Sequence, residues 1–168
     1  MIRIDIDDRD VLQSLQRLQR RVDDLTPAMR EIGEVLVQST IDRFKISIAP
    51  DGSRWAPNSP ATIMAYVAGR GGTVSKRDGK MTKKGAKLAA SKKPLIGETR
   101  SLSTQIHYRA GTASVEVGSP MEYAPIHQRG GWSTFGGRRV RIPSRPFLGL
   151  YESDRRSVLE IIEEHLAG

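Results

Sequence analysis

The chain has 168 residues, no cysteine, and a composition that is 38% hydrophobic and 5% aromatic. This length predicts a single domain, and the modest hydrophobic fraction suggests surfaces that are buried only on assembly. The lack of cysteine excludes disulfides and thiolate metal sites. There is no membrane-length apolar run and the N-terminus is acidic, so we expect a protein made in a cytoplasm without membrane contact.

The net charge of +8 is confined to one segment, Gly69–Lys93, where Asp78 is the only acid. Its basic residues are Arg70, Lys76, Arg77, Lys80, Lys83, Lys84, Lys87, Lys92 and Lys93. The rest of the segment is mostly Gly, Ser, Thr and Ala, which predicts a flexible basic insertion at 69–93 with one helical turn near Gly85–Ala90. Two interpretations stay open: contact with nucleic-acid phosphates or an acidic partner, and a solvated linker.

The N-terminal region is expected to begin with a short strand, Ile2–Ile6, because apolar and polar residues alternate there. Aspartates at positions 7, 8 and 10 can cap the helix that follows. That helix carries an apolar stripe spaced by four and three residues, as in coiled coils: Val11, Leu15, Leu18, Val22 and Leu25. The stripe predicts a partner helix, in the same chain or in a neighbouring subunit.

A second helix is predicted over Thr26–Ile46, with Thr26 as N-cap and proline at the first helical position. Trp55 follows in a proline-flanked irregular segment, where we expect it to anchor the loop to the core. Ser59 and Pro60 begin a short helix that ends near residue 69.

Two-residue periodicity predicts strands Gln105–Ala110 and Ser114–Gly118, joined as a hairpin. A short helix, Met121–Gln128, precedes a second hairpin with glycines 136 and 137 near its tip and Val140–Pro143 as its return strand. The chain closes with a proline-stiffened apolar stretch, 145–149, and a helix, Ser153–Leu166, with Ser153 as N-cap. We therefore predict an α+β fold, with an antiparallel sheet from two hairpins packed against three to four helices. The expected core anchors are Leu36, Phe44, Trp55 and Phe147.

No constellation for catalysis is present. The histidines at positions 107, 127 and 165 lack metal-ligand spacing, the serines lack a nucleophile elbow, and there is no cysteine nucleophile. We therefore expect neither an enzyme nor a cofactor. A nuclease would need converging acids or histidines, which the sequence does not provide.

A glycine-rich hairpin gathers aromatic and basic residues typical of protein contacts: Trp132, Phe135, Arg138, Arg139 and Arg141. This cluster is interpreted either as a subunit or partner interface or as an ordinary hairpin whose aromatics fold back on the core.

Five phrases occur along the chain in this order: REIGEVLVQSTIDRF, APDGSRWAPNSPAT, LIGETRSLSTQIHY, VGSPMEYAPIHQRGG and IPSRPFLGL. In content and order they resemble the phage virion-morphogenesis (tail-completion) family of Mu-like phages. The long lysine-rich segment departs from the family pattern.

This resemblance implies a structural virion protein of the tail or neck, a tail-terminator-like subunit that completes the tail or joins it to the head. Its expected partners are further copies of itself in a homo-oligomeric ring, taken as a hexamer, the tail tube protein and head–tail connector proteins, with genome DNA possible in the lumen. Tail terminator and head–tail connector both stay open. The competing hypothesis is a free nucleic-acid-binding protein that acts through the lysine-rich segment.

Overall fold

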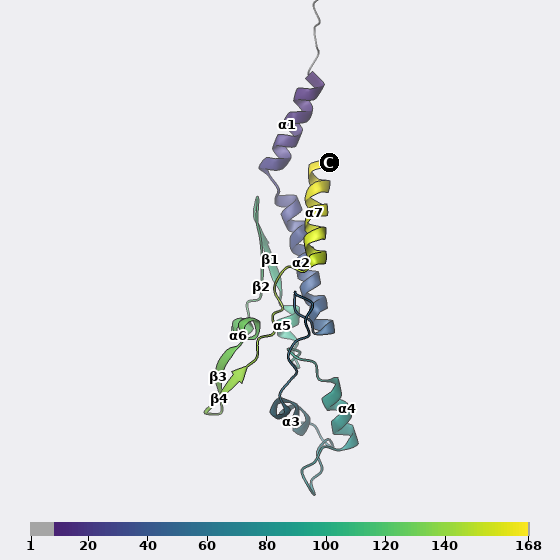
Figure 1. Cartoon of the computed structure of the whole chain (residues 1–168), viewed down its shortest axis with the longest axis vertical. Coiled ribbons are helices and arrows are strands. Elements are labelled where there is room, and N and C mark those ends of the chain that lie inside the picture. The colour runs from purple at the N-terminus through teal and green to yellow at the C-terminus, as the bar shows by residue number, and fades with distance from the viewer. Residues whose placement is uncertain (1–8, 168) are drawn as a thin grey trace, which may run out of the picture. The chain divides into compact units, whose positions relative to one another are not determined.

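A computed structural model describes residues 9–167 and contains seven helices and four strands in that range (Figure 1). The helices are α1 Arg9–Asp23, α2 Thr26–Ile46, α3 Pro60–Ala68, α4 Lys83–Ser91, α5 Ser101–Thr104, α6 Ala124–Arg129 and α7 Glu152–Ala167. The strands are β1 His107–Ala110, β2 Val115–Gly118, β3 Gly131–Phe135 and β4 Arg138–Ile142. This confirms the α+β class. The strand expected at Ile2–Ile6 and the caps expected at positions 7 and 8 lie outside the described residues.

The described chain forms two compact units. The helical unit comprises residues up to 39, 107–118 and those from 150 onward, while the motif unit comprises 40–106 and 119–149. Helix α2 contributes its first part to the helical unit and its last residues to the motif unit. The prediction of a single domain stays a prediction.

The strands form two separate two-stranded antiparallel sheets, β1–β2 and β3–β4. The prediction that both hairpins join one sheet was therefore wrong. The cause is their position in the fold: β1–β2 belongs to the helical unit and β3–β4 to the motif unit.

The core of the helical unit lies where α2, α7 and the β1–β2 hairpin meet (Figure 1). Ala28, Met29 and Ile32 of α2 pack with Ile161 of α7, and Val115 of β2 covers them. The Tyr108 ring lies against the α2 backbone at a glycine, where an added Cβ would be 2.2 Å from the ring. The first hairpin thus packs on α2 and α7, as predicted.

The starts of α3 and α7 show how local hydrogen bonds determine where a helix begins. At α3, Ser59 accepts a hydrogen bond from the Thr62 amide and proline follows, as predicted. At α7 the helix begins at Glu152, so Ser153 is not the cap. Instead the buried Asp154 accepts from the Tyr151 amide at 2.8 Å and from the Ser39 hydroxyl at 2.5 Å. A carboxylate one turn into a helix can bond back to the amide that precedes it.

Helix α6 begins at Ala124, three residues after the predicted start. It ends at Gly130, whose φ of 74° and close approach to the Ser144 backbone require glycine. The next residue, Gly131, starts β3.

Candidate functional site

The motif unit is organised around the extended segment Ser144–Gly149. Arg145 is buried, and its guanidinium donates to the carbonyls of Ala56 and Pro57, both at 2.7 Å. Burial lowers the pKa of this arginine. The indole of Trp55 donates to a carbonyl of the extended segment at 2.6 Å. Two side chains therefore join the APDGSRWAPNSPAT and IPSRPFLGL phrases.

Gln128 binds the same segment from α6. Its Oε1 accepts from the amides of Phe147 at 3.0 Å and Leu148 at 3.1 Å, and its Nε2 donates to the Leu148 carbonyl at 2.8 Å. Arg43 of α2 donates to the Phe147 carbonyl at 3.3 Å. Backbone groups in a buried, non-helical segment need such side-chain partners. These polar residues of the phrases therefore stabilise the fold by bonding backbone groups. The spacing of Gln128, Arg43 and Arg145 in the sequence did not predict this role.

Three aromatic rings fill the centre of the motif unit. Phe44 lies 5.1 Å from Trp55 and 5.3 Å from Phe147 between ring centroids, and all three side chains are buried. Leu36, placed with them by the sequence, is only half-buried and packs in the core of the helical unit.

The basic segment Gly69–Lys93 has more regular structure than its composition suggested. Val74 and Met81 form an antiparallel bridge, and Thr82 caps α4 by accepting from an amide at 3.1 Å. Thr73 is fully buried, with its hydroxyl 2.6 Å from the Val67 carbonyl. The predicted single helical turn is thus a capped helix of nine residues. The flexibility of the segment stays a prediction.

Four of its cations are used within the motif unit. Arg70 and Lys92 lie over the same Tyr66 ring, at 3.9 and 4.5 Å from its centroid, and Arg70 pairs with Glu98 at 2.7 Å. Burial and the charge of Arg70 lower the pKa of Lys92. Lys84 donates to the Gly71 carbonyl at 3.0 Å and Lys93 to the Lys45 carbonyl at 2.6 Å. No local pattern in the sequence indicated that the Tyr66 ring and the Glu98 carboxylate hold this group.

The other five cations of the segment are exposed. In the described part of the chain their side chains have no hydrogen bond or ion pair: Lys76, Arg77, Lys80, Lys83 and Lys87. We call them the outer cations. The first three lie on the turn between Val74 and Met81, and the last two on α4. Because they are solvated and close in sequence, they can contact a polyanion without cost to the fold.

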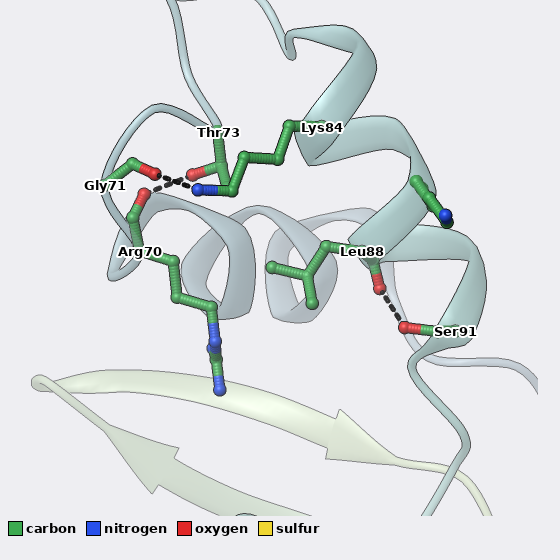
Figure 2. A pocket seen from close by; sticks show the side chains of 7 residues that line it. Arg70, Gly71, Thr73, Lys84, Leu88 and Ser91 are labelled. Carbon is green, nitrogen blue, oxygen red and sulfur yellow. Dashed lines mark hydrogen bonds between the residues drawn. The ribbon is translucent and has the colours of Figure 1, made fainter.

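A hollow of about 570 Å³ lies beside this segment (Figure 2). Figure 2 shows three paired polar groups in its lining: Lys84 with the Gly71 carbonyl, Thr73 with the Arg70 carbonyl, and Ser91 with the Leu88 carbonyl at 2.8 Å. Lys87, one of the outer cations, also lines the hollow, so the polar group that the hollow leaves for a ligand belongs to the outer cations. The outer cations are therefore the candidate for binding.

The β3–β4 ribbon carries the aromatic and basic cluster predicted from the sequence. Trp132 is opposite Arg141 in the register and diagonal to Arg139, whose guanidinium lies 4.8 Å from the indole centroid. Trp132 is 58% exposed, so it does not fold back on the core. Arg138 is also exposed, whereas the side chain of Phe135 lies outside the described ones. A solvated tryptophan flanked by arginines is a surface suited to a protein partner.

The three histidines do not converge. His107 is exposed, while His127 and His165 are half-buried, and each has one ring nitrogen without a hydrogen-bond partner in the described structure. Within residues 9–167, no three acidic or histidine side chains are placed to hold a metal ion. No helix in that range is long and apolar enough to span a bilayer.

The sequence profile of the phage virion morphogenesis family matches residues 6–167. The chain belongs to this family. It is 28% identical over 166 residues to "Mu-like prophage FluMu G protein 2" of Haemophilus influenzae, covering 98% of this chain and 96% of that protein. A 51-residue stretch is 33% identical to "Putative capsid assembly protein G" of Escherichia phage Mu, covering 30% of this chain and 33% of that one.

No solved structure matches the chain. Membership confirms the resemblance found in the sequence, and it gives the protein a structural or assembly role in a phage.

Proposed function

We propose that this protein completes the phage tail and joins it to the head, as a subunit of a homo-oligomeric ring at the neck. The observation that carries the proposal is the family match over residues 6–167, nearly the whole chain. The way the buried polar groups are used supports it, because Arg43, Gln128 and Arg145 bind backbone carbonyls or amides rather than facing a cavity. The protein is accordingly proposed to act as a structural component and not as an enzyme.

The exposed surfaces suit a ring between two other assemblies. The Trp132 face of the β3–β4 ribbon offers a protein contact, and the outer cations offer an electrostatic one. The tail tube protein and the head–tail connector proteins are the proposed neighbours. The name of the phage Mu relative refers to capsid assembly, and a junction protein touches the head as well as the tail.

The proposal is tested by deleting the gene from a phage that carries it. Cells infected with the deletion phage should contain DNA-filled heads and separate tails of abnormal length. Purified protein added to an extract of these cells should restore the joining of heads to tails. Electron micrographs of the purified protein should show closed rings. If the deletion instead abolishes capsids while tails remain normal, the protein acts in head assembly and the proposal is wrong.

The outer cations are proposed to contact DNA in the lumen of the ring or an acidic face of a neighbouring protein. We would replace Lys76, Lys80, Lys83 and Lys87 with glutamine and keep Lys84, because it binds the Gly71 carbonyl. A matched control removes four exposed cations of the helical unit: Arg30, Arg109, Arg155 and Arg156. Normal joining with impaired DNA retention supports the lumen contact, and failure to join supports the acidic neighbour. Wild-type behaviour in both assays would leave these cations without a role.

The second candidate is a free nucleic-acid-binding protein, favoured by the solvated outer cations. It requires that the purified protein bind DNA as a monomer, with an affinity that falls steeply with salt, since each neutralised phosphate contributes a slope of about 0.9 in log K against log salt. A ring without measurable DNA affinity excludes it.

A further inference from the structure

Helix α1 presents a row of large apolar side chains to solvent. Leu15 is 56% exposed, Leu18 44% and Val22 55%, and Leu12 beside them is 49% exposed. Leu25, the last residue of the predicted stripe, is partly buried in the core of the helical unit. The stripe is therefore covered at Leu25 and open at Leu15, Leu18 and Val22.

Such a helix is not stable by itself. A helix of about 15 residues is marginal in water, and packing of its apolar face supplies most of its stability. Helix α1 has 15 residues. It contacts α7 near its own C-terminal end, where Arg21 donates to the Leu166 carbonyl at 3.1 Å (Figure 1). We therefore expect a further partner to pack on the exposed part of the stripe and stabilise the helix.

The spacing of the stripe indicates that the partner is a helix. Its residues recur at intervals of four, three and four, the period that brings two helices together with interlocking side chains. The other exposed large apolar residues on helices of the described chain are isolated: Ile46, Met64 and Leu159. The matching stripe that this chain can offer is therefore α1 of another copy.

The order of side chains in the stripe indicates an antiparallel arrangement. In sequence it reads Val11, Leu15, Leu18, Val22, which is the same in both directions in residue type and in spacing. When two such helices run antiparallel, leucine lies opposite leucine and valine opposite valine around a two-fold axis.

Charge is compatible with the same arrangement. Arg21 lies next to the stripe, where the other neighbours Ser14 and Gln19 are neutral. An antiparallel pair separates the two copies of Arg21 by about nine residues, or about 13.5 Å along the axis at 1.5 Å per residue, so it does not bring these like charges together.

We propose that α1 pairs with α1 of a second copy of this chain as an antiparallel two-stranded helix pair. This two-fold contact goes beyond the proposed ring and does not depend on it, because it joins two subunits whether they are free or belong to two rings.

The first test is the mass of the full-length protein in solution, by native mass spectrometry and sedimentation. The wild-type protein should form an assembly with an even number of subunits. The double variant Leu15→Gln, Leu18→Gln should have half the wild-type mass, with the pair weakened by at least about a thousandfold because four buried leucines are lost per pair. The matched control Leu159→Gln removes an equally exposed leucine of α7, which is 58% exposed, and should keep the wild-type mass.

The second test determines the relative direction of the two helices by disulfide formation. Because the chain has no cysteine, each disulfide must join introduced cysteines. A mixture of Leu15→Cys and Leu18→Cys proteins should form a disulfide between the two variants faster than Leu18→Cys forms one with itself. The opposite order would indicate a parallel pair and overturn the antiparallel arrangement.

Three results would overturn the proposal: a wild-type monomer at all concentrations, an unchanged mass for the double variant, or a monomer that floats with phosphatidylserine vesicles. The last would show that the stripe binds a lipid surface. A paired protein that never forms rings would leave this inference standing and contradict the neck proposal, so the two can fail separately.

Discussion

The extended segment Ser144–Gly149 and the basic segment Gly69–Lys93 use the same kind of residue in opposite ways. In the first, the cation at position 145 is buried and bonds two carbonyl groups. In the second, most cations are solvated, and the four that are used act at the surface: two over the Tyr66 ring and two on backbone carbonyls. A basic side chain thus has a structural role where backbone carbonyls need donors, as at positions 145, 84 and 93, and is available for binding where they do not.

The largest effect should come from the aromatic centre of the extended segment. Phe147→Ala should lower the free energy of unfolding by about 3–5 kcal/mol, since it empties a fully buried site against Phe44. Leu36→Ala should cost less, because that leucine is half-buried. Urea unfolding of both variants measures the difference, and equal losses would show that burial does not separate these two positions.

A loss nearly as large is expected for Arg145→Leu. The substitution leaves the carbonyls of Ala56 and Pro57 without their donors, and hydrogen bonds to charged groups contribute about 1.5–3 kcal/mol each. The control is Arg138→Leu, which changes an exposed arginine of β4. If both variants unfold at the same urea concentration, the buried arginine does not hold the segment.

A single added methyl group at Gly85, in the first turn of α4, should destabilise the basic segment. A Cβ at Gly85 would lie 2.1 Å from the Thr73 carbonyl, so Gly85→Ala should displace α4 and cost about 1–3 kcal/mol. Gly71→Ala adds the same group where nothing lies within 4 Å and should stay within about 0.5 kcal/mol of wild type. Amide exchange of α4 should accelerate in the first variant alone, and unchanged exchange there would mean that the segment is not packed at this point.

The smallest effect is a pH dependence at the edge of the extended segment. Burial, and then the charge of Arg145, hold the pKa of His127 below its usual 6.5. Between pH 6.5 and that lower value the unfolded chain binds a proton that the folded chain does not, so the free energy of unfolding falls as the pH drops through this window. His127→Asn should weaken this dependence, whereas the exposed control His107→Gln should keep it. If the free energy of unfolding changed equally with pH in the wild type and in both variants, His127 would not be the cause of the pH dependence.

Sequence periodicity and cap chemistry were sufficient for most helices and for both hairpins. The apolar pattern of α2, the serine–proline start of α3 and the glycines after α6 are local signals, and local backbone preferences determine where such elements begin and end. The order of five phrases was also sufficient for the family, because a family match depends on residue identity and not on contacts.

Only the tertiary structure decided what the individual polar residues do. Arg145 and Lys87 are both basic residues beside small or apolar neighbours in sequence, yet one is buried against carbonyls from residues 56 and 57 and the other is solvated. Likewise α1 and α2 both carry apolar residues on one face, but α7 and a hairpin pack on that face of α2, whereas Leu15, Leu18 and Val22 of α1 are exposed. Burial depends on which distant segments of the chain contact one another, and local sequence patterns do not predict those contacts.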